Sequence, residues 1–330
     1  MSRPSYRVQR KVATSNISAG QFDTKDLPRG YDMESLLFRI SGSVQVTGAA
    51  TSVRAEAPCQ LVSRIIVLAD GKNALMNEPF WALALGRYDR QLPASGARAT
   101  TPPSAAGVAT YAVEAIGIYD FMTPDGLRPK DSNFRTSRLT LFQAQLFFGQ
   151  PGDVFVGGTV VFSGQPTVDI SSIESVELPD EQGNFTTPLA LRKVTWQRVG
   201  VQASNPQFEI RLPAGNNIKA VLLRGEGSVT AGEPSTGVLN NIQLAAGVDV
   251  RLNLLAANLR AKNNADYGQV PAGYYIGDVT SKADNPINLT ELWDVTGQVE
   301  PKAVLDVVGG ANNFIDAIIT EYILAAPAAP

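Results

Sequence analysis

The residues that could do chemistry are few, and their types exclude most reaction classes. The chain of 330 residues has no histidine and one cysteine, Cys59. Histidine is the commonest general base near neutral pH and a common metal ligand, so a Ser–His or Cys–His nucleophile cannot form. A single cysteine makes no intrachain disulfide and no metal cluster. We predict that the protein is not an enzyme and needs no cofactor. Its acidic loops could hold a structural Ca²⁺ ion, but no loop has the regularly spaced Asp and Asn residues that would identify such a site.

Paired carboxylates are the remaining catalytic possibility. Four acidic residues cluster in sequence, and they are Glu174, Glu177, Asp180 and Glu181. They straddle an apparent linker, so a solvated acidic face is favoured over a glycosidase-like pair. The glycine-rich stretch 225–232 (GEGSVTAG) has Thr230 where a dinucleotide-binding loop needs its third glycine, and it lies among strand-forming residues. Neither pattern predicts a catalytic site.

The composition predicts a globular protein with many short elements. Hydrophobic residues make up 44% and charged residues 18% of the chain, which also has 29 glycines and 21 prolines. No apolar run approaches the roughly 20 residues that span a bilayer, and the basic N-terminus lacks the apolar region of a secretory signal. The net charge of −3 argues against a dedicated nucleic-acid-binding protein.

The elements are organised around a duplicated stretch. Residues 27–44 (LPRGYDMESLLFRISGSV) recur as residues 212–229 (LPAGNNIKAVLLRGEGSV) at a constant offset of 185 (212 − 27 and 229 − 44). In each copy a Leu-Pro-x-Gly turn leads into a strand-forming run. An offset of this size indicates two domain-sized halves built on one plan, because solenoid and propeller repeats have periods of 20–50 residues.

Strand patterns separated by turns fill both halves. The predicted strands are residues 36–46, 61–68, 111–121, 138–148, 154–162, 191–201, 208–212, 274–279, 289–295 and 314–324. Short helices are predicted at 80–88 (FWALALGRY) and, from leucines at helical spacing, at 249–262. Residues 91–110 read as a long surface loop, and 179–188 as a linker. The second half is predicted to be shorter by about 35 residues, partly because it lacks this loop.

These elements predict an all-β protein with two tandem eight-stranded jelly-roll β-sandwiches (a double jelly roll) and one or two short helices in each. The predicted domains are residues 1–183, including a basic N-terminal arm at 1–22, and residues 184–330.

Several stretches make the chain resemble the double jelly-roll major capsid proteins, most of all those of the corticovirus group of tailless bacterial viruses with an internal membrane. The two Leu-Pro-x-Gly openings are similar to the family's. So are the strand with its Asp-Gly turn at 61–71, the close of the first roll at 139–164 (LTLFQAQLFFGQPGDVFVGGTVVFSG) and the last strand at 314–324. The loop at 91–110 and the tail AAPAAP depart from the family's pattern.

The resemblance implies a viral structural protein. Homotrimers would form pseudo-hexagonal capsomers of an icosahedral capsid over an internal membrane, with penton and minor capsid proteins as partners and no specific nucleic acid. The protein would lie in the virion and assemble in the host cytoplasm. Under this interpretation Arg3, Arg7, Arg10 and Lys11 face anionic lipid. Each basic residue there is worth about 1 kcal/mol, which becomes effective when many subunits act together.

The alternative is a two-module β-sandwich protein that binds carbohydrate through exposed aromatic residues. Trp81, Trp196 and Trp293 are the three tryptophans, and all lie within apolar or alternating runs. The sequence therefore favours core positions for them over a sugar-binding surface.

Overall fold

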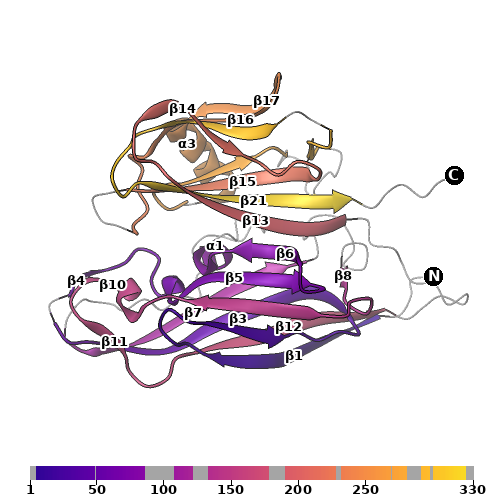
Figure 1. Cartoon of the computed structure of the whole chain (residues 1–330), viewed down its shortest axis with the longest axis vertical. Coiled ribbons are helices and arrows are strands. Elements are labelled where there is room, and N and C mark those ends of the chain that lie inside the picture. Colours follow the sequence, from indigo (N-terminus) through magenta and orange to yellow (C-terminus); the bar gives the residue numbers. More distant parts are fainter. Residues whose placement is uncertain are drawn as a thin grey trace, which may run out of the picture. The chain divides into compact units, whose positions relative to one another are not determined.

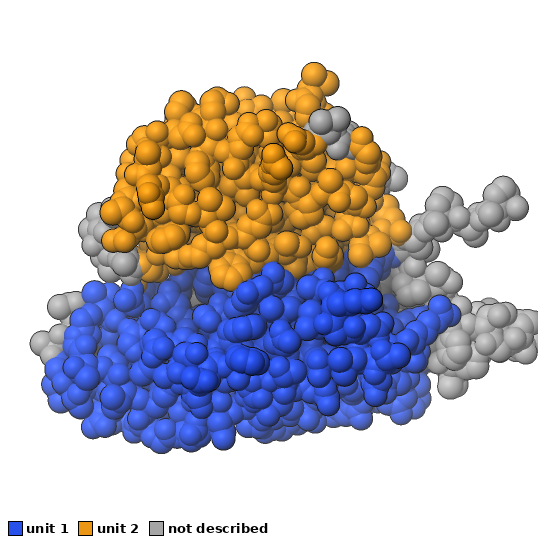
Figure 2. All heavy atoms as spheres, in the orientation of Figure 1, with its two compact units in different colours: residues 1–90, 96–192 blue, residues 91–95, 193–330 orange. Residues whose placement is uncertain are grey.

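The computed structural model describes residues 5–48, 50–85, 108–121, 133–177, 190–227, 232–268, 270–280, 291–297 and 300–324. The chain divides into two compact units, coloured separately in Figure 2. The N-terminal unit comprises residues 1–90 and 96–192, and the C-terminal unit comprises residues 91–95 and 193–330. The domain boundary expected between 183 and 184 lies outside the described residues, as does the predicted linker.

The principal described strands of the N-terminal unit lie in two antiparallel sheets (Figure 1). The first contains, in spatial order, β1 (Ser5–Asn16), β12 (Thr167–Glu177), β3 (Asp32–Val46) and β7 (Thr110–Asp120). The second contains β2 (Phe22–Asp26), β9 (Phe142–Phe148), β5 (Val62–Ala69) and β6 (Asn73–Glu78). Alternate residues such as Phe38 and Ile40 on β3 and Ile65 and Val67 on β5 are fully buried in the core.

Smaller elements complete this unit. They are β4 (Ala50–Val53), the 3₁₀ turn η1 (Cys59–Leu61), α1 (Phe80–Leu85), β8 (Phe134–Arg135), the 3₁₀ turn η3 (Pro151–Val154), β10 (Phe155–Gly157) and β11 (Val160–Phe162). The β8 strand pairs with the start of β3, β11 pairs with its end, and β4 pairs with β10.

The C-terminal unit repeats this arrangement. Its first sheet contains β13 (Ala190–Gly200), β21 (Phe314–Leu324), β15 (Asn217–Glu226) and β18 (Tyr274–Asp278). Its second sheet contains β14 (Asn205–Arg211), β20 (Pro301–Val307), β16 (Leu239–Ala246) and β17 (Asp249–Leu255). The short β19 (Trp293–Asp294) pairs with the start of β15, and α3 (Ala256–Tyr267) connects β17 to β18 as α1 connects β6 to β7.

Strand order identifies each unit as a jelly roll. If the eight principal described strands of a unit are numbered along the chain, both units have sheets ordered 1-8-3-6 and 2-7-4-5. The register repeats as well. Asp32 pairs with Arg135 on β8 as Asn217 pairs with Asp294 on β19, and 217 − 32 is the offset of 185. The predicted all-β double jelly roll is confirmed.

The duplicated stretch occupies the same place in both units. The backbone N–H of Leu27 donates to the carbonyl oxygen of Phe142 at 2.8 Å, and that of Leu212 donates to Pro301 at 2.8 Å. The glycine of each Leu-Pro-x-Gly turn, Gly30 or Gly215, has a positive φ of 136° or 113°, which side chains rarely permit. Each turn then feeds a strand, as the sequence predicts, and the structure shows that this strand is the third of its jelly roll.

The offset between equivalent residues falls along the chain. Ser35 pairs with Asp120 and its equivalent Ala220 pairs with Asp278, so the offset there is 158 (278 − 120). At the last strand it is 147 (314 − 167). The C-terminal unit is therefore shorter by 38 residues (185 − 147), close to the predicted 35. The extra length of the N-terminal unit lies between β6 and β7, where 86–107 are outside the described residues, and around β4, β10 and β11.

Three predicted elements were wrong. The N-terminal segment is not a free arm, because residues 5–16 form β1 and pair with β12. Residues 154–162 are not one strand, because Gly157 and Gly158 have φ near 72° and 74° and separate β10 from β11. Residues 249–255 form a strand before α3, because Leu252 and Leu254 alternate toward the core at the two-residue period of a strand. No helix within the described ranges is long and apolar enough to cross a membrane.

Candidate functional site

Three of the four basic residues predicted to face a membrane lie on β1 and are paired with carboxylates. Arg7 Nε is 2.6 Å from Glu34 Oε2 on β3, and Lys11 Nζ is 2.7 Å from Asp169 Oδ1 on β12. Arg10 donates from Nε and Nη2 to the two carboxylate oxygens of Glu174, at 2.9 and 3.0 Å. Arg3 lies outside the described residues. These ion pairs link β1 to β12 and β3, and they leave little unbalanced positive charge on the three residues.

The sequence predicts that the acidic cluster is a solvated face, and this prediction is wrong at Glu174. This side chain is fully buried, because β1 covers it and Arg10 and the Ser172 hydroxyl bind its carboxylate. Glu177 is the last residue of β12, and Asp180 and Glu181 lie outside the described residues. Among the described residues, Glu174 thus has an arginine and a serine hydroxyl as the partners of its carboxylate.

A second duplicated pattern lies on the last strand of each unit. Asp169 and Glu174 on β12 correspond to Asp316 and Glu321 on β21, both pairs separated by five positions and related by the offset of 147. Glu174 lies opposite Met33, and Glu321 lies opposite Ile218, the residue equivalent to Met33. Both glutamates are fully buried. Both strands contain the sequence pattern D-x₄-E, but comparing the two halves of the chain at an offset of 185 residues does not align the two copies.

The aspartate of this pattern sits in a buried ionic cluster in the C-terminal unit. Arg224 Nη1 is 3.0 Å from Asp316 Oδ2 and 2.8 Å from Glu226 Oε2, and Arg198 on β13 contacts both carboxylates at 3.0 and 2.7 Å. Arg224 Nη2 also donates to the carbonyl oxygen of Gly232 at 2.7 Å. Only 2% of the Arg224 side chain is exposed, so its charge is fully compensated by protein groups.

Burial and charge act in opposite directions on the acids of these clusters. Burial raises the pKa of Glu226, but the hydrogen bond from Arg224 and the positive charges of Arg198 and Arg224 outweigh it, so the net pKa is lowered. The pKa of Asp169 is lowered by its hydrogen bonds to Lys11 and Thr14, against a smaller effect of burial. Both carboxylates are therefore ionised at neutral pH.

The N-terminal unit carries an exposed version of the same cluster. Arg39 is equivalent to Arg224 (39 + 185), yet 47% of its side chain is exposed, and it pairs with Glu114 at 2.5 Å. The difference arises because the chain after β15 folds back in the C-terminal unit, where the Ser235 N–H donates to the Gly225 carbonyl oxygen at 2.7 Å. This segment covers Arg224, whereas Arg39 stays open to solvent.

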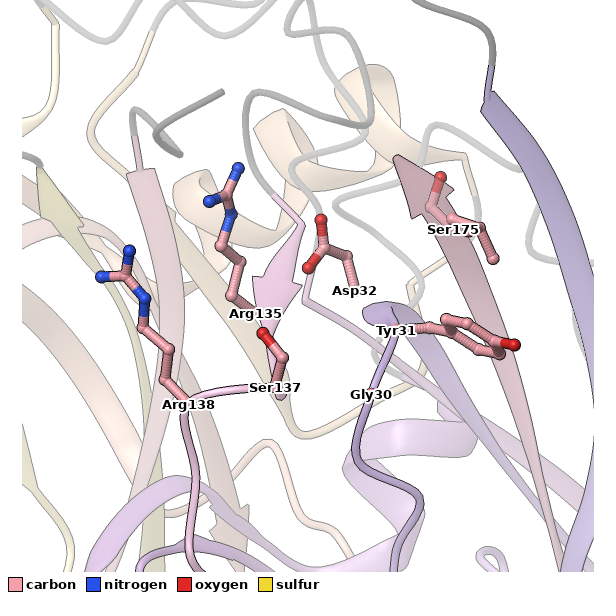
Figure 3. Close-up of a pocket in the computed structure, with 8 residues that line it drawn as sticks. Gly30, Tyr31, Asp32, Arg135, Ser137, Arg138 and Ser175 are labelled. Atoms are coloured by element: carbon pink, nitrogen blue, oxygen red, sulfur yellow. The ribbon is translucent and has the colours of Figure 1, made fainter. Parts of the chain in front are cut away.

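A pocket of about 360 Å³ lies beside the first Leu-Pro-x-Gly turn (Figure 3). Its lining residues are Gly30, Tyr31, Asp32, Arg135, Ser137, Arg138, Ser175 and Val176. The turn is fixed by Thr136, whose Oγ1 accepts from the Gly30 N–H at 3.2 Å and donates to the Tyr31 carbonyl oxygen at 2.5 Å. The lining offers guanidinium, hydroxyl and carboxylate groups but no histidine or cysteine, so it has no obvious nucleophile–base pair.

The remaining chemical candidates are structural in their surroundings. Cys59 is buried. In the part of the chain that the structure describes, no group of three or more Cys, Asp or Glu residues is arranged to hold a metal ion. Trp81 and Trp293 are buried, as predicted, and the half-buried Trp196 donates its indole N–H to Asp316 at 3.0 Å. Trp81 and Trp293 therefore offer no open sugar-stacking surface, whereas the core position predicted for Trp196 is wrong because that side chain is only half-buried.

Together the two units define a double jelly roll, and comparison with solved structures finds this fold over the whole chain. The major capsid protein in "Crystal Structure of the STIV MCP" aligns with a TM-score of 0.75 and 17% identity, covering 97% of each chain. The major capsid protein P2 of bacteriophage PM2 aligns with a TM-score of 0.57 and 15% identity, covering 98% of each. The PBCV-1 virus capsid aligns with a TM-score of 0.64 and 11% identity, covering 99% of this chain and 98% of that one.

No protein-family model and no curated protein matches the sequence. The structures that share the fold are double jelly-roll major capsid proteins, and they include that of PM2, a corticovirus. The resemblance predicted from the sequence is thus confirmed at the level of the fold.

Proposed function

We propose that this chain is the major capsid protein of an icosahedral virus, and that it acts by assembling with copies of itself and not by catalysis. One observation carries the proposal. Two jelly rolls with the same strand order and register span the chain, and capsid proteins share this arrangement over at least 97% of their own length in the three structures compared. The buried charges that could suggest an active site are consumed in ion pairs between strands.

The proposed building block is a homotrimer. Each subunit contributes two jelly rolls of one plan, so three subunits supply six similar units, which suit a pseudo-hexagonal footprint. Subunits related by a three-fold axis meet through heterologous contacts that close into a ring. Such capsomers would tile an icosahedral shell with penton and minor capsid proteins as partners, in the virion, after assembly in the host cytoplasm.

An internal membrane beneath the shell is the finer part of the proposal. Arg3, Arg7, Arg10 and Lys11 are the residues proposed to face it. Three of them are paired with carboxylates, so each subunit presents much less than four unbalanced charges and attachment depends on many subunits together. Sedimentation of the purified oligomer with anionic and with neutral vesicles tests this. Equal binding of the oligomer to anionic and neutral vesicles would contradict the proposal. So would an Arg3→Gln/Lys11→Gln variant that binds anionic vesicles as strongly as the unmodified protein.

Light scattering of the purified full chain tests the self-assembly itself. The proposal predicts a stable species of three times the chain mass of 35.2 kDa. A protein that remains a monodisperse monomer at all concentrations and salt conditions that keep it folded would overturn it.

A further inference from the structure

The outer face of the second sheet in the N-terminal unit carries apolar side chains among polar ones such as Thr24, Gln143 and Gln145. Four side chains on β2, β5 and β9 point away from the core and form what we call the aromatic face, and they are Phe22, Ile66, Leu68 and Phe147. Phe22 is 66% exposed, and its ring stacks on that of Phe147 with centroids 5.9 Å apart. The Arg64 guanidinium lies 5.5 Å from the centre of the Phe147 ring.

The duplicated unit shows that the fold does not require this face to be apolar. Ala69 pairs with Phe142 as Ala246 pairs with Pro301, which fixes offsets of 177 for β5 and 159 for β9. The β2 strand keeps the offset of 185. The residues equivalent to the aromatic face are Gln207, Gln243, Ala245 and Asp306. The C-terminal unit therefore has polar or small side chains at these four positions.

The C-terminal unit exposes a different apolar surface. Val248, Val250 and Leu255, in and beside β17, are 102%, 48% and 57% exposed, and we call them the valine strip. Val250 pairs with Ala245 as Ala74 pairs with Leu68, so the N-terminal unit has only an alanine in place of Val250. Each unit thus carries exposed apolar side chains at positions where its duplicate lacks them.

We propose that the aromatic face of one copy binds the valine strip of a second copy of this chain. Identical subunits that close into a ring need two different complementary patches, one on each side of the subunit. Two duplicated units whose apolar patches differ supply such a pair. Exposed apolar patches mark interaction sites, and aromatic and arginine side chains are enriched in interface cores. This inference rests on the proposed self-assembly and names the surfaces that carry it.

Substitutions taken from the chain's own duplicate test the aromatic face. Phe22→Gln/Ile66→Gln installs the residues that the C-terminal unit carries at these positions, and Val161→Gln, at a 42% exposed site on β11, is the matched control. We expect the double variant to weaken oligomer formation by more than about 30-fold, as loss of central interface aromatics does, with unchanged circular dichroism. The control should keep the mass of the unmodified protein.

Disulfide trapping tests the pairing, because Cys59 is buried and gives little background. A mixture of Phe22→Cys and Val250→Cys chains should form cross-linked dimers on mild oxidation, and neither chain alone should. Dimers of Phe22→Cys alone would show the aromatic face meeting itself and overturn the inference. An oligomer unaffected by Phe22→Gln/Ile66→Gln would also overturn it while leaving the proposed function intact, whereas an unmodified chain that stays monomeric would remove both.

Discussion

Arg224 offers the sharpest test of how the fold is held together, because the chain carries a matched control for it. The Arg224→Met variant keeps most of the apolar length of the side chain and removes the charge. Asp316 and Glu226, 0% and 4% exposed, then lose a shared partner. Removing one partner of a buried ion pair costs about 3–5 kcal/mol, since the remaining charge stays buried without compensation.

Arg198 reduces this cost. It still contacts both carboxylates at 3.0 and 2.7 Å and is itself 36% exposed, so we expect the low end of the range, about 3 kcal/mol. The control is Arg39→Met, at the equivalent position of the N-terminal unit. Its partner Glu114 is 37% exposed, and such surface pairs contribute about 0–1 kcal/mol.

Thermal unfolding followed by circular dichroism measures the contrast. For domains of this size 1 kcal/mol corresponds to about 2–4 °C, so Arg224→Met should lower the unfolding midpoint of the C-terminal unit by about 6–12 °C. Arg39→Met should lower that of the N-terminal unit by no more than about 4 °C. Equal shifts for the two variants, or a more stable Arg224→Met, would refute the argument that the cluster needs its buried arginine.

Two further predictions concern acid and packing. The pKa of Glu226 is lowered on folding, so the unfolded chain binds more protons in acid than the folded chain does. This carboxylate's contribution to stability is therefore lost as the pH falls below about 4.5. The Glu226→Gln variant should have a flatter curve of stability against pH below that value, and an unchanged slope would contradict the prediction. Gly149→Ala should cost roughly 1–3 kcal/mol in denaturant unfolding, because its Cβ would lie 2.1 Å from the Gln60 carbonyl oxygen, whereas Gly152→Ala, with open space around it, should change stability by less than about 1 kcal/mol.

The duplicated stretch made the fold predictable from the sequence. An ungapped match at an offset of 185 indicates two units of one plan, and its Leu-Pro-x-Gly turns mark the start of a strand in each. Only the structure shows that this is the third strand of each unit. Strand alternation and turn residues then give the fold class. The domain boundary was harder to place, because residues 179–188 combine turn-forming and charged residues without a unique break.

The positions of the charged residues could not be predicted. The basic residues at 7–11 look like a solvated arm, because nothing local indicates that β12, more than 150 residues away, pairs with them. The burial of Glu174 follows from that same long-range pairing. Leucines at 252, 255 and 259 fit a helical period, but the tertiary contacts of β17 with β16 favoured a strand up to Leu255.

The central claim is that this double jelly roll builds a shell from copies of itself. Cryo-electron microscopy of the purified chain, concentrated under conditions that promote assembly, tests this most directly. The account predicts trimeric particles with a six-lobed, pseudo-hexagonal projection that associate side by side. Single subunits, or dimers with two-fold symmetry only, would contradict it.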